Sequence, residues 1–187
     1  MRIVGSKHRS RTLFTPKDNA VRPTSDKVRQ AVFNILNSRG LVVDAIVIDA
    51  FCGTGALGLE AVSQGAAQCS FFDKDRDSIA LTKQNIEALK EEDCCHVMLQ
   101  DATNIKAKSD NMEPASLVFL DPPYNKELVT KAIESLSDKG WLSDEACLVI
   151  ETAKHEVISC PRIDIMLEKT YGESKITLAE LNLAQVN

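Results

Sequence analysis

Between residues 45 and 151, short apolar runs alternate with segments of helical length. This alternation is the feature that most limits how the chain can fold. The apolar runs cover 45–51, 68–73, 96–100, 116–120 and 147–151, and helical patterns cover 57–66, 76–90 and 128–136. Strands that alternate with helices build a mostly parallel sheet whose two faces are covered by helices. The sequence therefore predicts an α/β, Rossmann-like fold.

The two ends of the chain add to this pattern. Residues 25–36 predict an amphipathic helix, because Val28, Val32, Ile35 and Leu36 share one face. Residues 163–169 and 175–181, joined through Tyr171–Ser174, predict a C-terminal antiparallel hairpin that completes a seven-stranded sheet. We expect residues 1–40 to form a basic extension that does not fold independently, and residues 41–187 to form one domain.

Charge is distributed unevenly along the chain. Residues 1–40 contain nine Lys or Arg and two Asp, whereas the other 147 residues contain 13 Lys or Arg and 25 Asp or Glu. Lys and Arg contacts to phosphate supply most of the sequence-independent affinity for nucleic acid. The extension is thus a candidate RNA-binding arm, and a solubilising tail is the alternative. The candidate contacts are Lys7, Arg9, Arg11, Arg22 and Arg29, and for Arg22 and Arg29 the cofactor and Asp26 are alternative partners.

Several classes of protein are disfavoured by composition. No run approaches the roughly 18 uncharged apolar residues of a membrane-spanning helix, and the N-terminus lacks the apolar core of a secretory signal. Three scattered His and no Cys-x-x-Cys pair predict that no metal is bound. The six Cys fall mostly in apolar runs and are expected to be free, buried thiols. We expect a cytoplasmic protein, without membrane contact, that acts as a monomer.

A glycine-rich segment follows the first strand of the alternating region. Gly53, Gly55 and Gly58 form G-x-G-x-x-G between a strand and a helix, which is the context that makes this motif credible. Asp73 ends the next strand, 18 residues beyond Gly55, where a carboxylate typically binds ribose hydroxyls. The segment predicts a nucleoside-containing cofactor.

Two aspartates favour S-adenosylmethionine over NAD. Asp49 precedes Gly53 by four residues, a position that is awkward for a pyrophosphate but suitable for a ligand with ammonium and sulfonium charges. Asp101, after the third strand, is placed to accept a hydrogen bond from the adenine amine. The alternative role for Asp49 is to cap the glycine loop.

The fourth strand ends in Asp121-Pro122-Pro123-Tyr124. The prolines lack N–H groups and stiffen the chain, so their carbonyl oxygens join the Asp121 carboxylate as a cluster of acceptors. Such a cluster suits the exocyclic amine of a nucleobase, on which Tyr124 can stack. The alternative is a rigid loop, but the position beside the cofactor favours a catalytic role.

These motifs carry a family resemblance. The segment from Asp49 to Gly58, followed by 121–124, resembles class I S-adenosylmethionine-dependent methyltransferases that modify exocyclic amines. The opening Arg2–Gly5, the stretch Arg22–Arg29 and the pair Gly140-Trp141 extend it, so that the chain resembles RsmD-type 16S ribosomal RNA guanine-N2 methyltransferases over nearly its whole length.

The resemblance implies methylation of a guanine N2 in 16S rRNA, within the small ribosomal subunit. It assigns Asp49, Phe51, Gly53, Gly55 and Gly58 to the cofactor loop, Asp73 to ribose, Asp101 to adenine, and Asp121, Pro122, Pro123 and Tyr124 to the target base. The chain departs from the family pattern at Cys52, where alanine is common, and at Asp73-Lys74-Asp75, where Glu-x-Asp is usual.

Three other functions remain open from the sequence. DNA adenine-N6 methylation would use the same Asp-Pro-Pro-Tyr chemistry, although the chain is short for a DNA sequence-reading domain. An NAD-dependent oxidoreductase would use the same glycine loop, but no acid–base His or Tyr-x-x-x-Lys is evident. A non-catalytic RNA-binding module would use the arm alone.

Overall fold

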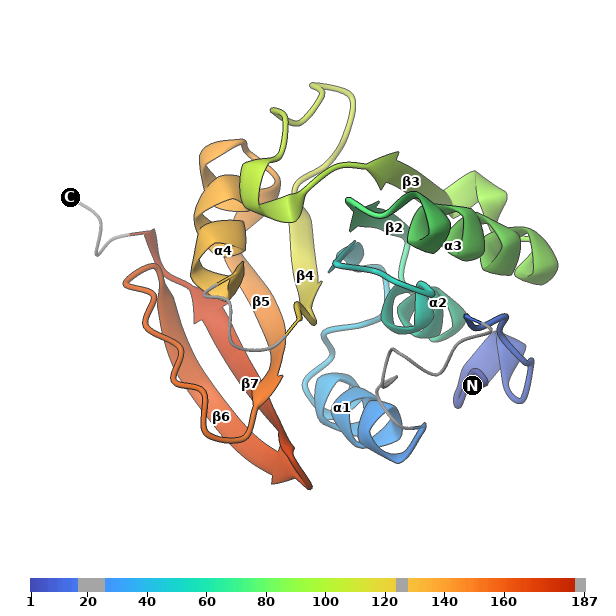
Figure 1. Ribbon diagram of the computed structural model, residues 1–187, viewed down its shortest axis with the longest axis horizontal. Helices are drawn as coiled ribbons and strands as arrows, with labels where there is room; N and C mark the ends of the chain where they lie inside the picture. Colours follow the sequence, from blue (N-terminus) through green and yellow to red (C-terminus); the bar gives the residue numbers. More distant parts are fainter. Residues whose placement is uncertain (17–25, 124–127, 184–187) are drawn as a thin grey trace.

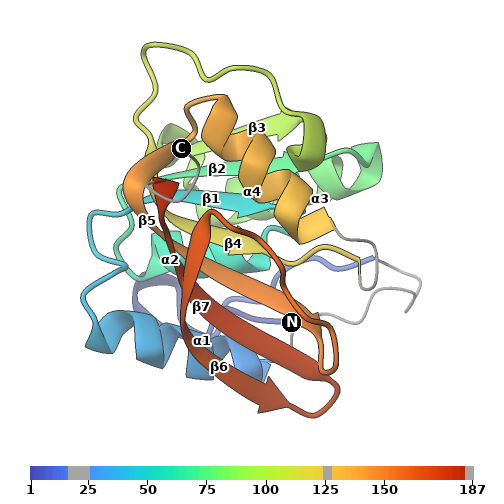
Figure 2. The same cartoon turned by 90° about the vertical axis from the view of Figure 1, so that its left-hand side faces the viewer.

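The computed structural model describes residues 1–16, 26–123 and 128–183 and contains one seven-stranded sheet. Its strands are β1 (Ile46–Ala50), β2 (Gln68–Asp73), β3 (Cys95–Leu99), β4 (Ala115–Leu120), β5 (Leu142–Ala153), β6 (Ile163–Tyr171) and β7 (Ser174–Leu181). They lie in the order β3-β2-β1-β4-β5-β7-β6, which Figure 2 shows from top to bottom. The first five in this order pair in parallel, and β7 pairs antiparallel with both β5 and β6.

Helices cover both faces of the sheet. In the described part of the chain they are α1 (Asp26–Ser38), α2 (Ala56–Ser63), α3 (Arg76–Leu89) and α4 (Leu128–Asp138), with short 3-10 turns η1 (Ser6–His8), η2 (Glu92–Cys94) and η3 (Ala102–Asn104). The apolar residues of α1, α2 and α3 share one core cluster, and those of α4 and η3 share the other. In Figure 1, α4 accordingly lies across the sheet from α1 and α2.

Alternate side chains of each central strand enter different hydrophobic cores, one on each face of the sheet. Val47 and Leu117 are fully buried toward α1–α3, and their neighbours Ile48 and Val118 are buried toward α4. Successive residues of a strand point to opposite faces, so a strand covered on both faces is apolar throughout. This explains why the sequence pattern consists of continuous apolar runs.

The basic N-terminal arm is folded onto the domain. An antiparallel bridge joins Arg2 to Thr12, and the amide of Ile3 donates to the carbonyl of Arg11 at 2.9 Å. Ile3 and Leu13 are buried in the core cluster of α1–α3. Figure 1 shows the arm beside α2 and the end of α3. The arm is therefore anchored by apolar side chains and is not a free tail.

The predicted fold class, the mostly parallel seven-stranded sheet and the C-terminal hairpin are confirmed. One predicted strand was too short, since β5 begins at Leu142 and not at Cys147. All six Cys are free, although Cys94 and Cys160 are only partly buried. Within the described residues, no helix is long and apolar enough to cross a membrane, and no cluster of three His, Cys, Asp or Glu could hold a metal ion.

Candidate active site

Four aspartates stand at the carboxyl ends of four neighbouring parallel strands. Asp101 follows β3, Asp73 ends β2, Asp49 is the penultimate residue of β1, and Asp121 follows β4. The strands adjoin one another in the order β3-β2-β1-β4. Chain connections run in opposite directions on either side of β1, and ligands of open α/β sheets bind at such a switch point. The topology thus brings the four predicted carboxylates to one edge of the sheet.

The glycine loop after β1 is held close to β2. The amide of Cys52 donates to the carbonyl of Phe72 at 2.9 Å, and the amide of Gly53 donates to Oδ2 of Asp73 at 3.0 Å. Gly53 has a φ of 54°, and a Cβ placed on it would meet no atom within 4 Å. Gly53 therefore leaves open space at the loop, where a ligand can approach the backbone.

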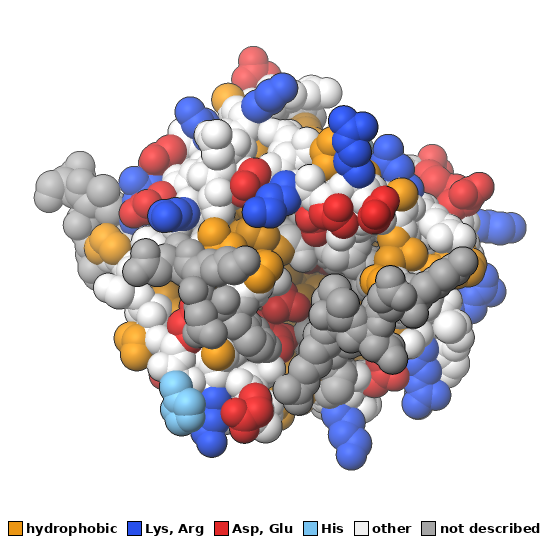
Figure 3. All heavy atoms as spheres, in the orientation of Figure 1, with side chains coloured by type: hydrophobic (Ala, Val, Ile, Leu, Met, Phe, Trp, Pro, Cys, Tyr) orange, Lys and Arg blue, Asp and Glu red, His pale blue; other side chains and the backbone are white. Residues whose placement is uncertain are grey.

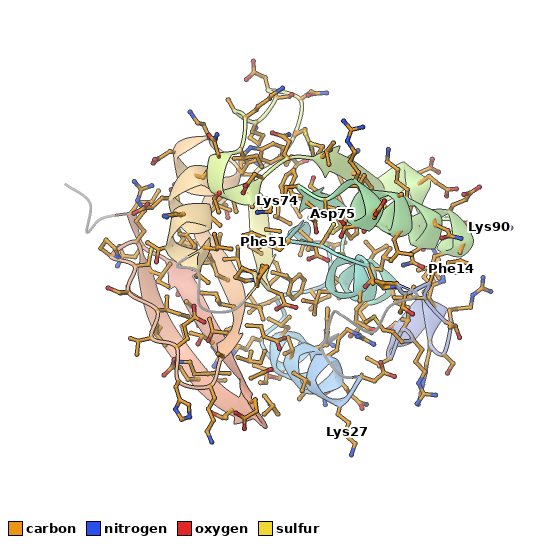
Figure 4. All side chains as sticks on the ribbon, viewed as in Figure 1. Phe14, Lys27, Phe51, Lys74, Asp75 and Lys90 are labelled. Atoms are coloured by element: carbon orange, nitrogen blue, oxygen red, sulfur yellow. The ribbon has the colours of Figure 1, made fainter. Side chains whose placement is uncertain are left out.

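Phe51 enters this loop in a strained conformation. Its φ is 67°, in the left-handed region that bulky residues rarely occupy. Such a conformation costs about 1–3 kcal/mol and persists where the surroundings enforce it, often at functional sites. Figure 4 places Phe51 near the middle of the molecule, close to Lys74 and Asp75 at the end of β2. The strain supports the predicted site at this turn.

Gly58 serves packing. A Cβ at this position would lie 2.4 Å from Cε1 of Phe71 and 2.6 Å from Sγ of Cys69, both on β2. Only glycine lets α2 approach the sheet this closely. The amide of Gly58 donates to Oδ2 of Asp49 at 2.9 Å, so Asp49 caps the start of α2, as the alternative interpretation of this residue expected.

Asp49 is the most buried of the four carboxyl groups, with 2% of its surface exposed. Burial raises its pKa well above the usual value, the amide of Gly58 opposes the rise, and the nearby charges of Asp121 and Asp73 add to it. A buried carboxyl group among other carboxylates favours a cation as its partner. The site is therefore electrostatically suited to a positively charged ligand.

Asp73 and Asp101 also organise their own turns. Besides holding Gly53, Asp73 accepts from the amide of Asp75 at 2.9 Å through Oδ1. Asp101 accepts from the amide and the hydroxyl of Thr103 at 2.9 and 2.7 Å, and the hydroxyl bond is the main reason that its pKa is lowered. Both carboxylates are partly exposed. Each is fixed in position and still reachable from solvent.

The acceptor cluster after β4 lies beside these groups. Asp121 is partly exposed, Pro122 is buried and Pro123 is exposed. The charge of Asp121 contributes to the raised pKa of Asp49, which shows that the ends of β1 and β4 interact electrostatically. Tyr124, the fourth residue of the motif, lies outside the described residues.

Two residues of α3 that the sequence analysis did not predict support the glycine loop after β1. The hydroxyl of Thr82 donates to the carbonyl of Gly53 at 2.9 Å, and the side-chain amide of Asn85 donates to the carbonyl of Thr54 at 2.9 Å. Both side chains are fully buried. A signal was present in the sequence, because two polar residues three apart interrupt the apolar face that Ile79 and Ile86 define on this helix.

The predicted RNA-binding residues differ in their exposure. Lys7, Arg9 and Arg11 are exposed on the arm. Lys7 forms a 2.6 Å ion pair with Glu91, and Arg11 donates to the carbonyl of Ala88 at 2.9 Å. Arg22 lies outside the described residues. Of the three exposed side chains, Lys7 already has a carboxylate partner and Arg11 already binds a backbone carbonyl.

The assignment of Arg29 to RNA binding is corrected by the structure. Arg29 is fully buried and pairs with Asp26 at 2.8 Å and with Glu60 at 3.3 Å, and it also donates to the carbonyl of Arg2. Helical periodicity placed it beside the buried stripe of α1, but its buried carboxylate partner comes from a different helix. Its role is to join α1, α2 and the arm.

Figure 3 shows the face of the molecule seen in Figure 1. Acidic and hydrophobic side chains gather near its centre, while Lys and Arg lie mostly toward the outline. This arrangement matches the converging aspartates described above.

The sheet order and the helices on both faces define a Rossmann-like protein, and four aspartates stand at its switch point. The family model described as Conserved hypothetical protein 95 matches residues 1–180. The chain belongs to this family.

Its relatives are named as methyltransferases. Ribosomal RNA small subunit methyltransferase D of Escherichia coli (strain K12) is 38% identical over 81% of this chain and 74% of its own length. The protein of the same name in Haemophilus influenzae is 31% identical over 92% and 89%. The solved structure of yhhF from Escherichia coli has a TM-score of 0.83, with 33% identity over 97% of this chain and 98% of that one. The expected membership in a ribosomal RNA methyltransferase family is confirmed.

Proposed function

We propose that this protein transfers a methyl group from S-adenosylmethionine to the exocyclic N2 amine of a guanine in 16S rRNA of the small ribosomal subunit. The observation that carries the proposal is the convergence of Asp49, Asp73, Asp101 and Asp121 on one edge of the sheet around the glycine loop. Family membership supports the reaction class, because the relatives are named for ribosomal RNA methylation.

The residues present fit the cofactor. Gly53 leaves open space at the loop, and Asp73 beside it can accept from ribose hydroxyls. Asp101 would accept from the adenine amine, and the buried Asp49 suits the ammonium group. When bound, S-adenosylmethionine supplies an electrophilic methyl group on a sulfonium.

The target base would meet the acceptor cluster after β4. Asp121 and the proline carbonyls hold the hydrogens of N2, so that the nitrogen lone pair points at the methyl carbon. The cofactor, held by Asp49, Asp73 and Asp101, would give its methyl group to this nitrogen and leave as a neutral thioether. The nitrogen becomes cationic before it loses a proton to water, and Asp121 stabilises that charge. Alignment of the three atoms can supply about 7–11 kcal/mol.

The arm would hold the RNA. Lys7, Arg9 and Arg11 provide exposed cations on a segment fixed to α2 and α3, and phosphate contacts of this kind position a nucleic acid without reading its sequence. A guanine in an unpaired loop is reached at the lowest unstacking cost. We propose that the protein works in the cytoplasm as a monomer, without a metal.

The proposal is tested by methyl transfer from labelled S-adenosylmethionine to unmethylated small ribosomal subunits, free ribosomal RNA and double-stranded DNA, with the product nucleosides identified. We expect label in N2-methylguanosine. Label in N6-methyladenosine from DNA would contradict the substrate but keep the cofactor. Binding of NAD in place of S-adenosylmethionine would contradict the cofactor, and RNA binding with no transfer to any substrate would contradict catalysis.

A further inference from the structure

Asn85 joins the N-terminal arm to the glycine loop. Its Oδ1 accepts from the amide of Phe14 at 2.7 Å, and its Nδ2 donates to the carbonyl of Phe14 at 3.1 Å and to the carbonyl of Thr54 at 2.9 Å. Asn85 is fully buried. A single side chain on α3 thus satisfies both backbone groups of one arm residue and one carbonyl of the loop.

On the side of the glycine loop, hydrogen bonds from α3 fix the backbone. Thr82, one turn earlier on α3, binds the carbonyl of Gly53, so that α3 holds two successive carbonyls of the loop. The amide of Gly53 lies 3.0 Å from Oδ2 of Asp73, one of the carboxylates proposed to hold the cofactor. A displacement of the Thr54 carbonyl would therefore be transmitted over two peptide units to the Gly53 amide beside that site.

The arm side of the link is anchored independently on α2. The amides of Val4 and Gly5 each donate to Glu60 at 2.8 Å, and Glu60 is fully buried. The hydroxyl of Thr54 also contacts Sδ of Met1 at 3.7 Å. The arm consequently bridges the two helices that flank the glycine loop, and Asn85 connects arm and loop at a second point besides the contact between Thr54 and Met1.

We propose that Asn85 is a positioning residue through which the docked arm supports the glycine loop, so that the affinity for the cofactor depends on the arm. The inference rests on the proposed function, since it concerns the affinity of the same proposed cofactor site. The physical reason is that a buried amide must keep its partners. If Phe14 withdraws, Asn85 loses a donor and an acceptor, and its hold on Thr54 weakens because leaving buried polar groups unpaired is costly.

Phe14 offers a matched pair of variants to test this. Asn85 contacts Phe14 through the backbone, and the phenyl ring is 48% exposed. Phe14→Ala removes the ring and keeps both hydrogen bonds, whereas Phe14→Pro also removes the N–H that Asn85 accepts from. Any difference between the two variants reports on the link and not on the lost ring.

The readout is the dissociation constant for S-adenosylhomocysteine, measured by calorimetry on the full chain, together with hydrogen exchange of the peptide containing 52–58. For Phe14→Pro we expect about five- to tenfold weaker binding and faster exchange in this peptide than for Phe14→Ala. We expect Phe14→Ala to match the unaltered chain within twofold. Asn85→Ala should weaken binding further, because it also leaves the carbonyl of Thr54 without its partner.

Equal affinity and equal exchange in the two Phe14 variants would overturn the inference while leaving the proposed function intact. Failure of the unaltered chain to bind S-adenosylhomocysteine would contradict the proposed cofactor and this inference with it. Asn85 lies in the core, so Asn85→Ala can fail to fold. In that case the comparison of Phe14→Pro with Phe14→Ala decides whether cofactor affinity depends on the arm.

Discussion

Asp49 shows how a single residue can favour binding over stability. Its carboxyl group is buried beside Asp73 and Asp121, and burial raises its pKa. The folded state therefore binds a proton more tightly than the unfolded state does. It follows that the contribution of Asp49 to stability falls as pH rises from the ordinary Asp range toward the raised pKa. A bound cation would reverse this loss.

We therefore predict that Asp49→Asn stabilises the ligand-free protein. Asn keeps an oxygen for the amide of Gly58 and carries no charge. The stability advantage of the variant should therefore grow as pH rises from the ordinary Asp range toward the raised pKa of Asp49. Urea unfolding at a series of pH values measures it. The same variant should bind S-adenosylmethionine more weakly, and a variant less stable than the unaltered chain at neutral pH would contradict the electrostatic account.

Gly58 is predicted to be a packing residue. Gly58→Ala would place a methyl group 2.4 Å from the ring of Phe71, and overpacking of this kind costs about 1–3 kcal/mol. Thermal or urea unfolding should show that loss. Ala at the exposed position Ser38, at the end of α1, is a suitable control and should change stability by less than about 0.5 kcal/mol. Unchanged stability in Gly58→Ala would show that α2 can move away from the sheet.

At the residue scale, sequence reasoning located the aspartates but not their supports. Asp49, Asp73, Asp101 and Asp121 were predictable because each stands at the end of an apolar run, and parallel strands bring such ends together. Thr82 and Asn85 were not predicted, since their roles depend on carbonyls 29 and 31 residues away. Of the partners considered for Arg29, the structure bears out Asp26, whereas Glu60 was not predicted because it belongs to another helix.

At the scale of elements, α2 connects the glycine loop to the arm. It begins at Ala56, directly after Gly55, and carries Glu60, which accepts from the arm and from Arg29. Glu60 and Arg29 are both fully buried. Removing one partner of a buried ion pair is strongly destabilising, because it leaves the other charge uncompensated.

We predict that Glu60→Gln lowers the free energy of unfolding by about 3–5 kcal/mol, the range for a broken buried pair. Urea unfolding measures the change. Glu87→Gln, at an exposed position of α3, is the matched control and should have almost no effect. If both substitutions cost the same small amount, the Glu60–Arg29 pair does not hold the arm and helices together.

Element boundaries were predictable to different degrees. Strand β2 was predicted at its observed bounds, 68–73, because its apolar run is flanked by a polar residue and an aspartate. The first part of β5 was not, since residues 143–145 are polar and partly or fully exposed. The sheet shifts register between Ala115 and Leu117, where β4 meets this part of β5. Leu142 pairs with Ala115 and the ladder resumes at Cys147, so residues 143–146 form an irregular part of the strand.

At the scale of the whole molecule, the arm presents exposed cations near the C-terminal end of α3. Arg9→Ala with Arg11→Ala should weaken RNA binding and flatten its salt dependence by about one unit of slope for each lost phosphate contact. Binding measured at several salt concentrations tests this. An unchanged slope would assign the two arginines to packing. The buried Arg29 should not be used as a comparison, because its substitution would disturb the fold.

The central claim is that the acceptor cluster after β4 acts on the base and the remaining aspartates act on the cofactor. The most direct measurement is the rate of N2-methylguanosine formation on unmethylated small subunits by the unaltered chain and by Asp121→Ala, alongside the affinity of each for S-adenosylmethionine. We predict a fall in turnover of about 10²–10³-fold, typical of a lost group that stabilises developing charge, with little change in cofactor affinity. Equal losses in turnover and affinity would contradict the account.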